Sequence, residues 1–131
     1  ELTVCFMWHG HPFKSRIDWH DGDKPWDLKT CRDASPRGFR NAVNTYGYFM
    51  QGSLYVDACR ALDLPANGFT FLAQEKNHPY PYALYDLSDE ALEYGRAKNE
   101  QALAMILESR TKETLPYNLS GKQIIQLEDL W

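Results

Sequence analysis

The first third of the chain contains one apolar stretch and two stretches in which apolar and polar residues alternate. Alternation with a period of two is typical of β-strands, because successive side chains point to opposite faces of a sheet. The pattern predicts strands over residues 2–8, 14–19 and 26–30. The segments between them have turn chemistry, with Asp21-Gly22 in the second. We therefore expect an antiparallel meander of three strands.

Helix signals follow the third predicted strand. Ser35 suits an N-cap and Pro36 the first helical position, and Gly47 marks a break between two helical stretches. Further on, Ser88 suits the cap of a long helix with an acidic first turn. The pattern predicts helices over about 36–45, 48–62 and 88–110, and two more strands over 69–75 and 82–87. The order βββ-αα-ββ-α predicts an α/β or α+β domain with a mixed sheet, and residues 116–131 give no assignment.

Composition narrows the class of protein. The 131 residues suit a single globular domain over 1–131, and 44% of them are hydrophobic. A net charge of −4 argues against a basic nucleic-acid-binding module, but not against an enzyme that acts on nucleic acid, since a metal site needs carboxylates. The three cysteines form no CxxC pair, which favours a reducing cytoplasm, and no apolar run reaches membrane length.

The second and third predicted strands separate apolar from charged residues by parity. We expect one core to bury the apolar set, which is Ile17, Trp19, Trp26 and Leu28. The opposite face would then carry Asp18, Asp27 and Lys29, and a hairpin register can bring the two aspartates close together. The same alternation is also typical of a hairpin with a solvated polar face.

A metal site is the second interpretation of that charged face. Two neighbouring carboxylates repel each other, which raises the pKa of one of them. A divalent cation removes this conflict, and Mg²⁺ commonly binds one or two carboxylates together with waters and substrate phosphate. A lysine on the same side can offset charge that develops on a phosphate.

The spacing D-x8-D-x-K, followed by a helix that contains Gln51-x3-Tyr55, resembles the core of the PD-(D/E)XK nucleases. The run RIDW…WDLKTCRDASPRGF…YGYFMQGSLYVDA is similar to the nuclease domain of RecE, or exonuclease VIII-like, phage recombination exonucleases, a group related to the lambda-exonuclease and RecB types. The resemblance covers roughly residues 2–110. It implies a restriction-endonuclease-like core.

The resemblance also assigns roles to individual residues. Ile17 replaces the proline of the motif's name. The implied metal ligands are Asp18, Asp27 and the backbone carbonyl of Leu28. The implied catalytic residues are Asp18, Asp27, Lys29, Gln51 and Tyr55. Implied contacts to the substrate come from Arg16, Thr30, Arg32 and Tyr48.

These roles imply a DNA nuclease that depends on Mg²⁺, with Mn²⁺ as a substitute. The implied reaction is exonucleolytic digestion of linear duplex DNA, which leaves single strands for an annealing protein, and relatives form homo-oligomers. Two alternatives stay open: an inactive nuclease-fold module that binds DNA or acts in assembly, and an endonuclease or single-strand nuclease. Such families carry helices before the first strand, one of them with a further Glu or His near the metal. Because the chain starts at Glu1, we expect that segment to be absent.

The other candidate motifs predict simpler roles. His9, His11, His20 and Cys31 match no spacing of a structural zinc site. Asp21-Gly22-Asp23 lacks the later glutamate of a calcium loop, so we expect a turn. Among the aromatic residues that follow the helix break, we expect Tyr46 and Phe49 in the core, whereas Tyr48 and Tyr55 share a helix face with Gln51.

Overall fold

The computed structural model describes residues 1–112. The elements are β1 (Leu2–Trp8), β2 (His11–Ile17), β3 (Trp19–His20), β4 (Pro25–Cys31), α1 (Pro36–Tyr46), α2 (Tyr48–Ala61), β5 (Thr70–Glu75), β6 (Tyr82–Asp86) and α3 (Asp89–Lys112). The predicted fold class is confirmed, since a mixed sheet is combined with helices. Residues 116–131, which gave no assignment, lie outside the described residues.

Strands β1 and β2 form a two-stranded antiparallel hairpin in which Trp8 pairs with His11. The two residues between them, His9 and Gly10, have φ values of 48° and 77°. Positive φ at both central residues is the geometry of the tight turn that best matches the twist of paired strands. The turn is therefore shorter than the predicted 9–13, and β2 starts three residues before the predicted strand.

The predicted three-stranded meander is wrong. The chain bends at Asp18, and β3 then opens a second sheet with the order β3-β4-β5-β6. Strand β3 pairs with β4 only through Trp19 and His20, and β4 runs parallel to β5. The pattern could not show this change, because a bend of one residue leaves the alternation of both flanking strands intact. Beyond Trp26, the edge of β4 that faces away from β5 has no partner strand among residues 1–112.

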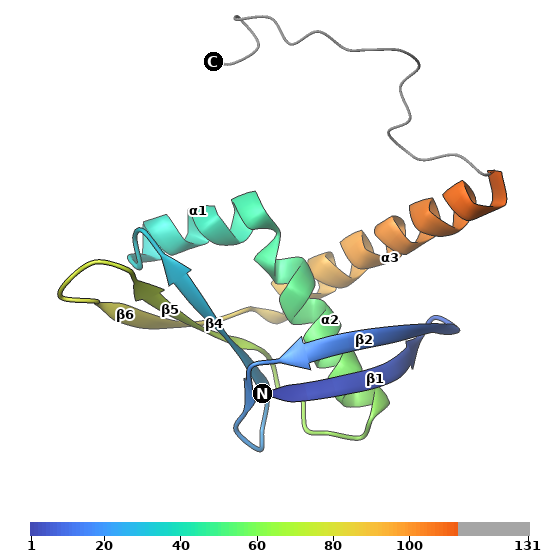
Figure 1. Ribbon diagram of the computed structural model, residues 1–131, viewed down its shortest axis with the longest axis horizontal. Helices are drawn as coiled ribbons and strands as arrows, with labels where there is room; N and C mark the ends of the chain where they lie inside the picture. The colour runs from blue at the N-terminus through green and yellow to red at the C-terminus, as the bar shows by residue number, and fades with distance from the viewer. Residues whose placement is uncertain (113–131) are drawn as a thin grey trace, which may run out of the picture. The chain divides into compact units, whose positions relative to one another are not determined.

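Helices α1 and α2 form the crossover between the parallel strands β4 and β5 (Figure 1). Ser35 caps α1 by accepting a hydrogen bond from the backbone of Gly38, as predicted. Gly47 ends α1 with φ 64°, a left-handed conformation that glycine adopts without strain. Helix α2 then contacts β4 of one sheet and β1 and β2 of the other. The core joins Phe39 of α1 and Val56 of α2 to the inner face of β5.

The described structure divides after Asn99, so the first eleven residues of α3 belong with the sheets and the rest forms a separate unit. The site described below lies entirely within residues 1–99. Among the helices of residues 1–112, none combines the length and the apolar character that a membrane span requires.

Candidate active site

Helix α2 lies close to the sheet at Gln51 because the next residue is a glycine. Gly52 is buried, and a Cβ atom there would lie 2.6 Å from Leu87 and 3.0 Å from Phe69. A Cβ contact of 2.6 Å essentially never occurs, so a larger residue would force Leu87 or the helix to shift. The close approach brings the Gln51 side chain over β4.

Asp27, Lys29 and Gln51 form a closed polar triangle between β4 and α2. Gln51 donates from Nε2 to Asp27 Oδ1 at 2.9 Å, and Lys29 Nζ donates to Gln51 Oε1 at 2.7 Å. Lys29 Nζ also lies 2.6 Å from Asp27 Oδ2. The chemistry of the partners fixes the orientation of the Gln51 amide: its nitrogen faces Asp27 because the carboxylate needs a donor, and its oxygen faces Lys29 because the ammonium needs an acceptor.

Tyr55 extends the triangle to the first hairpin. Its hydroxyl accepts from Gln51 Nε2 at 3.1 Å and donates to the backbone carbonyl of Arg16 at 2.6 Å. Gln51 and Tyr55 are one helical turn apart, so both face the same side of α2. This chain of hydrogen bonds holds α2 against β2 and fixes the rotamer of Gln51.

Asp18 approaches β4 at its open edge. Its Oδ2 accepts a hydrogen bond from the backbone N–H of Leu28 at 2.9 Å. In a β-strand, the N–H and C=O of one residue point to the same side of the strand. The Leu28 carbonyl therefore points to the edge where Asp18 lies, and the bend at Asp18 brings the two predicted ligands together.

Asp27 is poorly placed to carry its charge. Its burial raises the pKa of the carboxyl above 3.8, the ion pair with Lys29 opposes that rise, and the negative charge of Asp18 adds to it. The Oδ2 atom is buried and has no partner with hydrogen-bond geometry among the described residues, although Lys29 is near. A further positive ion beside Oδ2, in addition to the Lys29 ammonium, would stabilise the carboxylate more.

The residues present fit a magnesium-type ion. Asp18, Asp27 and the Leu28 carbonyl offer only oxygen ligands, and a set with one or two carboxylates suits Mg²⁺, which keeps several waters. No group of three or more His, Cys, Asp or Glu residues that could hold a metal occurs within residues 1–112. Because Mg²⁺ usually takes only one or two carboxylates from a protein, an ion held by the aspartate pair would complete its coordination with water or phosphate.

The predicted burial of the apolar set Ile17, Trp19, Trp26 and Leu28 is only partly correct: Ile17 is buried as predicted, but Trp19 and Leu28 are not. Trp19 is 55% exposed and Leu28 is 50% exposed, whereas Asp27 is 4% exposed. The β4 face that carries Asp27 and Lys29 is turned toward α2, and the face that carries Trp26 and Leu28 is turned away. Helix α2 can cover this charged face because Gln51 donates a hydrogen bond to Asp27 and accepts one from Lys29. The aspartates meet through the bend at Asp18, not through a shared polar face.

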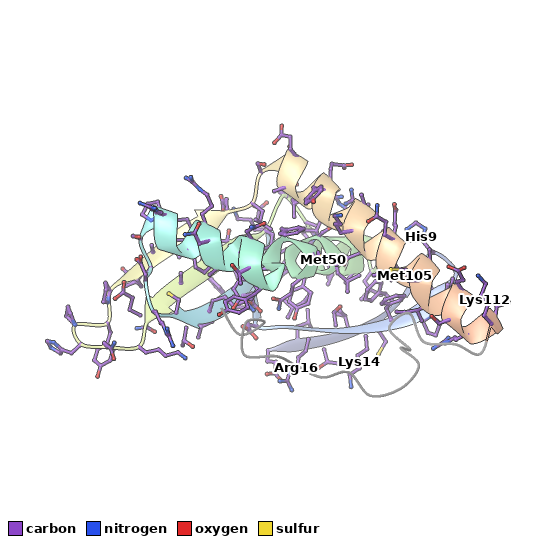
Figure 2. The ribbon with its side chains drawn as sticks, turned by 90° about the horizontal axis from the view of Figure 1, so that it is seen from above. His9, Lys14, Arg16, Met50, Met105 and Lys112 are labelled. Carbon is purple, nitrogen blue, oxygen red and sulfur yellow. The ribbon has the colours of Figure 1, made fainter. Side chains whose placement is uncertain are left out.

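The predicted substrate contacts are spread over the molecule. Arg16 and Lys14 project from the side of β2 turned away from α2, and Arg16 lies 3.6 Å from Glu1 (Figure 2). The Lys29 ammonium lies 4.5 Å from the ring centre of Tyr48. Thr30, Arg32 and Tyr48 line a common cavity at the end of β4. Only these three of the four predicted contacts lie together.

Sequence reasoning missed Tyr46, which lines the same cavity. It was predicted in the core, but it is 69% exposed, and its ring stacks on Tyr48 at 5.5 Å. The signal was its position. Tyr46 is the last residue of α1, next to a left-handed glycine, where a helix ends at the surface.

Comparison with protein families gives a match over residues 1–125 to the family described as "PDDEXK-like domain of unknown function (DUF3799)". The chain belongs to this family, so its predicted membership of the PD-(D/E)XK superfamily is confirmed. The closer resemblance to phage recombination exonucleases stays a prediction.

Among solved structures, the chain is similar to a protein from Eubacterium rectale described as a "Putative exonuclease". The TM-score is 0.73 at 19% sequence identity, over 98% of this chain. The match covers 55% of the other protein, so this chain spans about half of its length. At this identity the likeness shows a shared fold. A search of curated proteins returned no match.

Proposed function

We propose that this chain is the core of a metal-dependent DNA nuclease, with its active site at the open edge of β4. One observation carries the proposal: a buried aspartate, Asp27, is tied to Lys29 and Gln51, and a second aspartate is fixed beside it at the strand edge. Family membership and the similar fold support a nuclease.

Asp18, Asp27 and the Leu28 carbonyl would hold Mg²⁺ or Mn²⁺, which would make a water more acidic and offset charge on a phosphate group. Lys29 presents an ammonium already positioned by Asp27 and Gln51. Such a fixed donor stabilises negative charge that develops on a phosphate oxygen or on the attacking water. Gln51 keeps Lys29 and Asp27 in place, and Tyr55 keeps Gln51 in place.

The finer part of the proposal is exonucleolytic digestion of linear duplex DNA, leaving single strands for an annealing protein. The resemblance of the motif-bearing run to phage recombination exonucleases supports this reaction. The same resemblance supports self-association, because those relatives form homo-oligomers. The cysteine content supports a cytoplasmic location. Digestion of linear DNA with survival of a circular duplex would favour the exonucleolytic reaction. Cleavage of both forms would favour an endonuclease instead.

The test is cleavage of a linear duplex in Mg²⁺ or in EDTA, with Lys29→Ala beside the wild type. We expect cleavage only in Mg²⁺, and a loss of roughly 10²–10³-fold in Lys29→Ala, as for removal of one fixed donor to a transition state. Lys14→Ala is the matched control, because Lys14 is exposed on the far side of β2. A wild type without Mg²⁺-dependent cleavage, or an equally active Lys29→Ala, overturns the proposal.

A further inference from the structure

The cavity lined by Thr30, Arg32 and Tyr48 lies next to the candidate active site, beyond the end of β4. Its volume is about 600 Å³, within the range of small-molecule sites. Residues from four parts of the chain line it: the end of β4 with the loop that follows, one face of α1, the first residue of α2, and the residue after β5. The lining includes Arg32, Asp33, Asn41, Tyr46, Tyr48 and Lys76.

Tyr48 joins this cavity to the active site. One contact of its ring is the Lys29 ammonium at 4.5 Å, and another is the ring of Tyr46, stacked at 5.5 Å with 28° between the planes. Tyr46 is 69% exposed. The two rings therefore form a short stack that starts at Lys29 and ends at an aromatic surface open to solvent.

The charges in the cavity favour an anion. Arg32 and Lys76 are exposed, and no ion pair to either is recorded among residues 1–112. The one acidic lining residue, Asp33, accepts a hydrogen bond from the Ser35 backbone at 2.8 Å. Hydrogen bonds from the side chain and then the backbone of Ser35 lower the pKa of Asp33, which favours its charged form. Two cations against one carboxylate leave the lining net positive.

The open edge of β4 leads from the aspartates to this cavity. The Leu28 N–H points to that edge, where it meets Asp18, whereas the Cys31 carbonyl points to the opposite side, where it meets the backbone of Lys76. Because peptide groups alternate along a strand, Thr30 presents its N–H and C=O to the open edge. A polymer could follow this edge with backbone hydrogen bonds available to it.

We propose that the cavity binds an unpaired nucleotide of a single DNA strand, next to the phosphate held at the active site. The base stacks on Tyr46, and Arg32 and Lys76 hold the neighbouring phosphate. A single strand is favoured because a base inside a duplex has both faces already covered, whereas an exposed tyrosine is the common platform for unpaired bases. The inference rests on the proposed function for its choice of substrate.

The first test is equilibrium binding of a labelled octathymidylate, measured by fluorescence anisotropy in EDTA, where no cleavage occurs. Tyr46→Ala is expected to weaken binding about tenfold, within the range for loss of one stacked base. Tyr46→Phe keeps the ring and is expected to bind within about twofold of the wild type. Tyr82→Ala is the matched control: Tyr82 is 70% exposed but lies on β6, outside the cavity.

The second test is the salt dependence of the same binding. Arg32→Ala combined with Lys76→Ala should reduce the magnitude of the slope of log affinity against log salt by about 0.7, since the two side chains hold one phosphate and each neutralised phosphate of a single strand contributes about 0.7. Arg60→Ala, at the far end of α2, is expected to leave the slope unchanged.

Absence of octathymidylate binding by the wild type overturns the inference, and so does equal weakening by Tyr46→Ala and Tyr82→Ala. The inference is also overturned if Tyr46→Ala weakens the binding of an eight-base-pair duplex as much as the binding of octathymidylate, because the loss would then not depend on an unpaired base. These measurements are independent of cleavage. If binding behaves as expected and Mg²⁺ supports no cleavage, the proposed function fails and the nucleotide site stands.

Discussion

Two carboxylates, one in α2 and one on the strand that α2 covers, are paired with cations in different ways. Asp57 in α2 accepts hydrogen bonds from Arg96 on both oxygens, including one of 2.7 Å, and another from the Trp8 indole at 3.1 Å. Hydrogen bonds to Asp57, followed by its charge, raise the pKa of the Arg96 guanidinium further. Asp27 has a lysine and one glutamine hydrogen bond, and burial raises its pKa.

The difference separates stability from chemistry. The fork of Arg96 matches a carboxylate with two parallel donors, which fixes both groups and links β1, α2 and α3. Lys29 is a single point charge shared between Asp27 and Gln51, so Asp27 keeps one oxygen without a well-aligned donor. The Asp57 cluster is complete as it stands. The Asp27 cluster is stabilised further by any cation that reaches it.

The largest expected effect is the loss of stability when the Asp57 cluster is broken. Asp57→Ala should lower the free energy of unfolding by roughly 3–5 kcal/mol, because it leaves Arg96 partly buried without its main partner. Glu93→Ala removes the exposed partner of the same arginine and should lower it by less than about 1 kcal/mol. Urea unfolding curves measure both. Equal losses in the two variants would contradict the contrast between the clusters.

A smaller effect should appear when Mg²⁺ is added. An ion that binds only the folded chain stabilises it by about 2.7 kcal/mol at one hundred times its dissociation constant. We expect Mg²⁺ to raise the melting temperature of the wild type and of Lys14→Ala, but not that of Asp27→Asn, which lacks the charged ligand. EDTA should reverse the rise. A rise of the same size in Asp27→Asn would place the ion elsewhere.

The smallest effect is a dependence of stability on pH. Because the pKa of Asp27 is raised above 3.8 in the folded chain, the folded state binds more protons than the unfolded state just above that pH. The contribution of Asp27 to stability is therefore present at low pH and is lost as the pH rises through the raised pKa. Urea midpoints of the wild type minus those of Asp27→Asn should fall over that interval.

Asp33 gives the control of opposite sign for this measurement. Its hydrogen bonds with Ser35 lower its pKa below 3.8, so its contribution to stability is present above that pH and is lost as the pH falls. The midpoints of the wild type minus those of Asp33→Asn should therefore rise with pH. If both differences change in the same direction, the proposed environment of Asp27 is incorrect.

Much of the fold follows from local signals in the sequence. Ser35, Pro36 and Gly47 mark the limits of α1 because capping and φ preferences act within a few residues. The tight turn at His9-Gly10 was placed less well, since a non-glycine residue with positive φ gives no clear signal. The division into two sheets was not predictable, because strand pairing depends on contacts between distant segments.

The sequence alone identified the candidate catalytic residues, because their spacing and order can be read along the chain: Asp18, Asp27, Lys29, Gln51 and Tyr55. It also determined the succession of strands and helices, except that it joined β3 to β2 in a single strand. Only the tertiary structure decided which face of β4 is buried, since this depends on where α2 packs and on the donors that Gln51 brings to Asp27. It likewise decided that Tyr46 faces solvent and that Trp19 does not enter the core. Burial is a property of neighbours distant in sequence, and the alternation of one strand does not contain it.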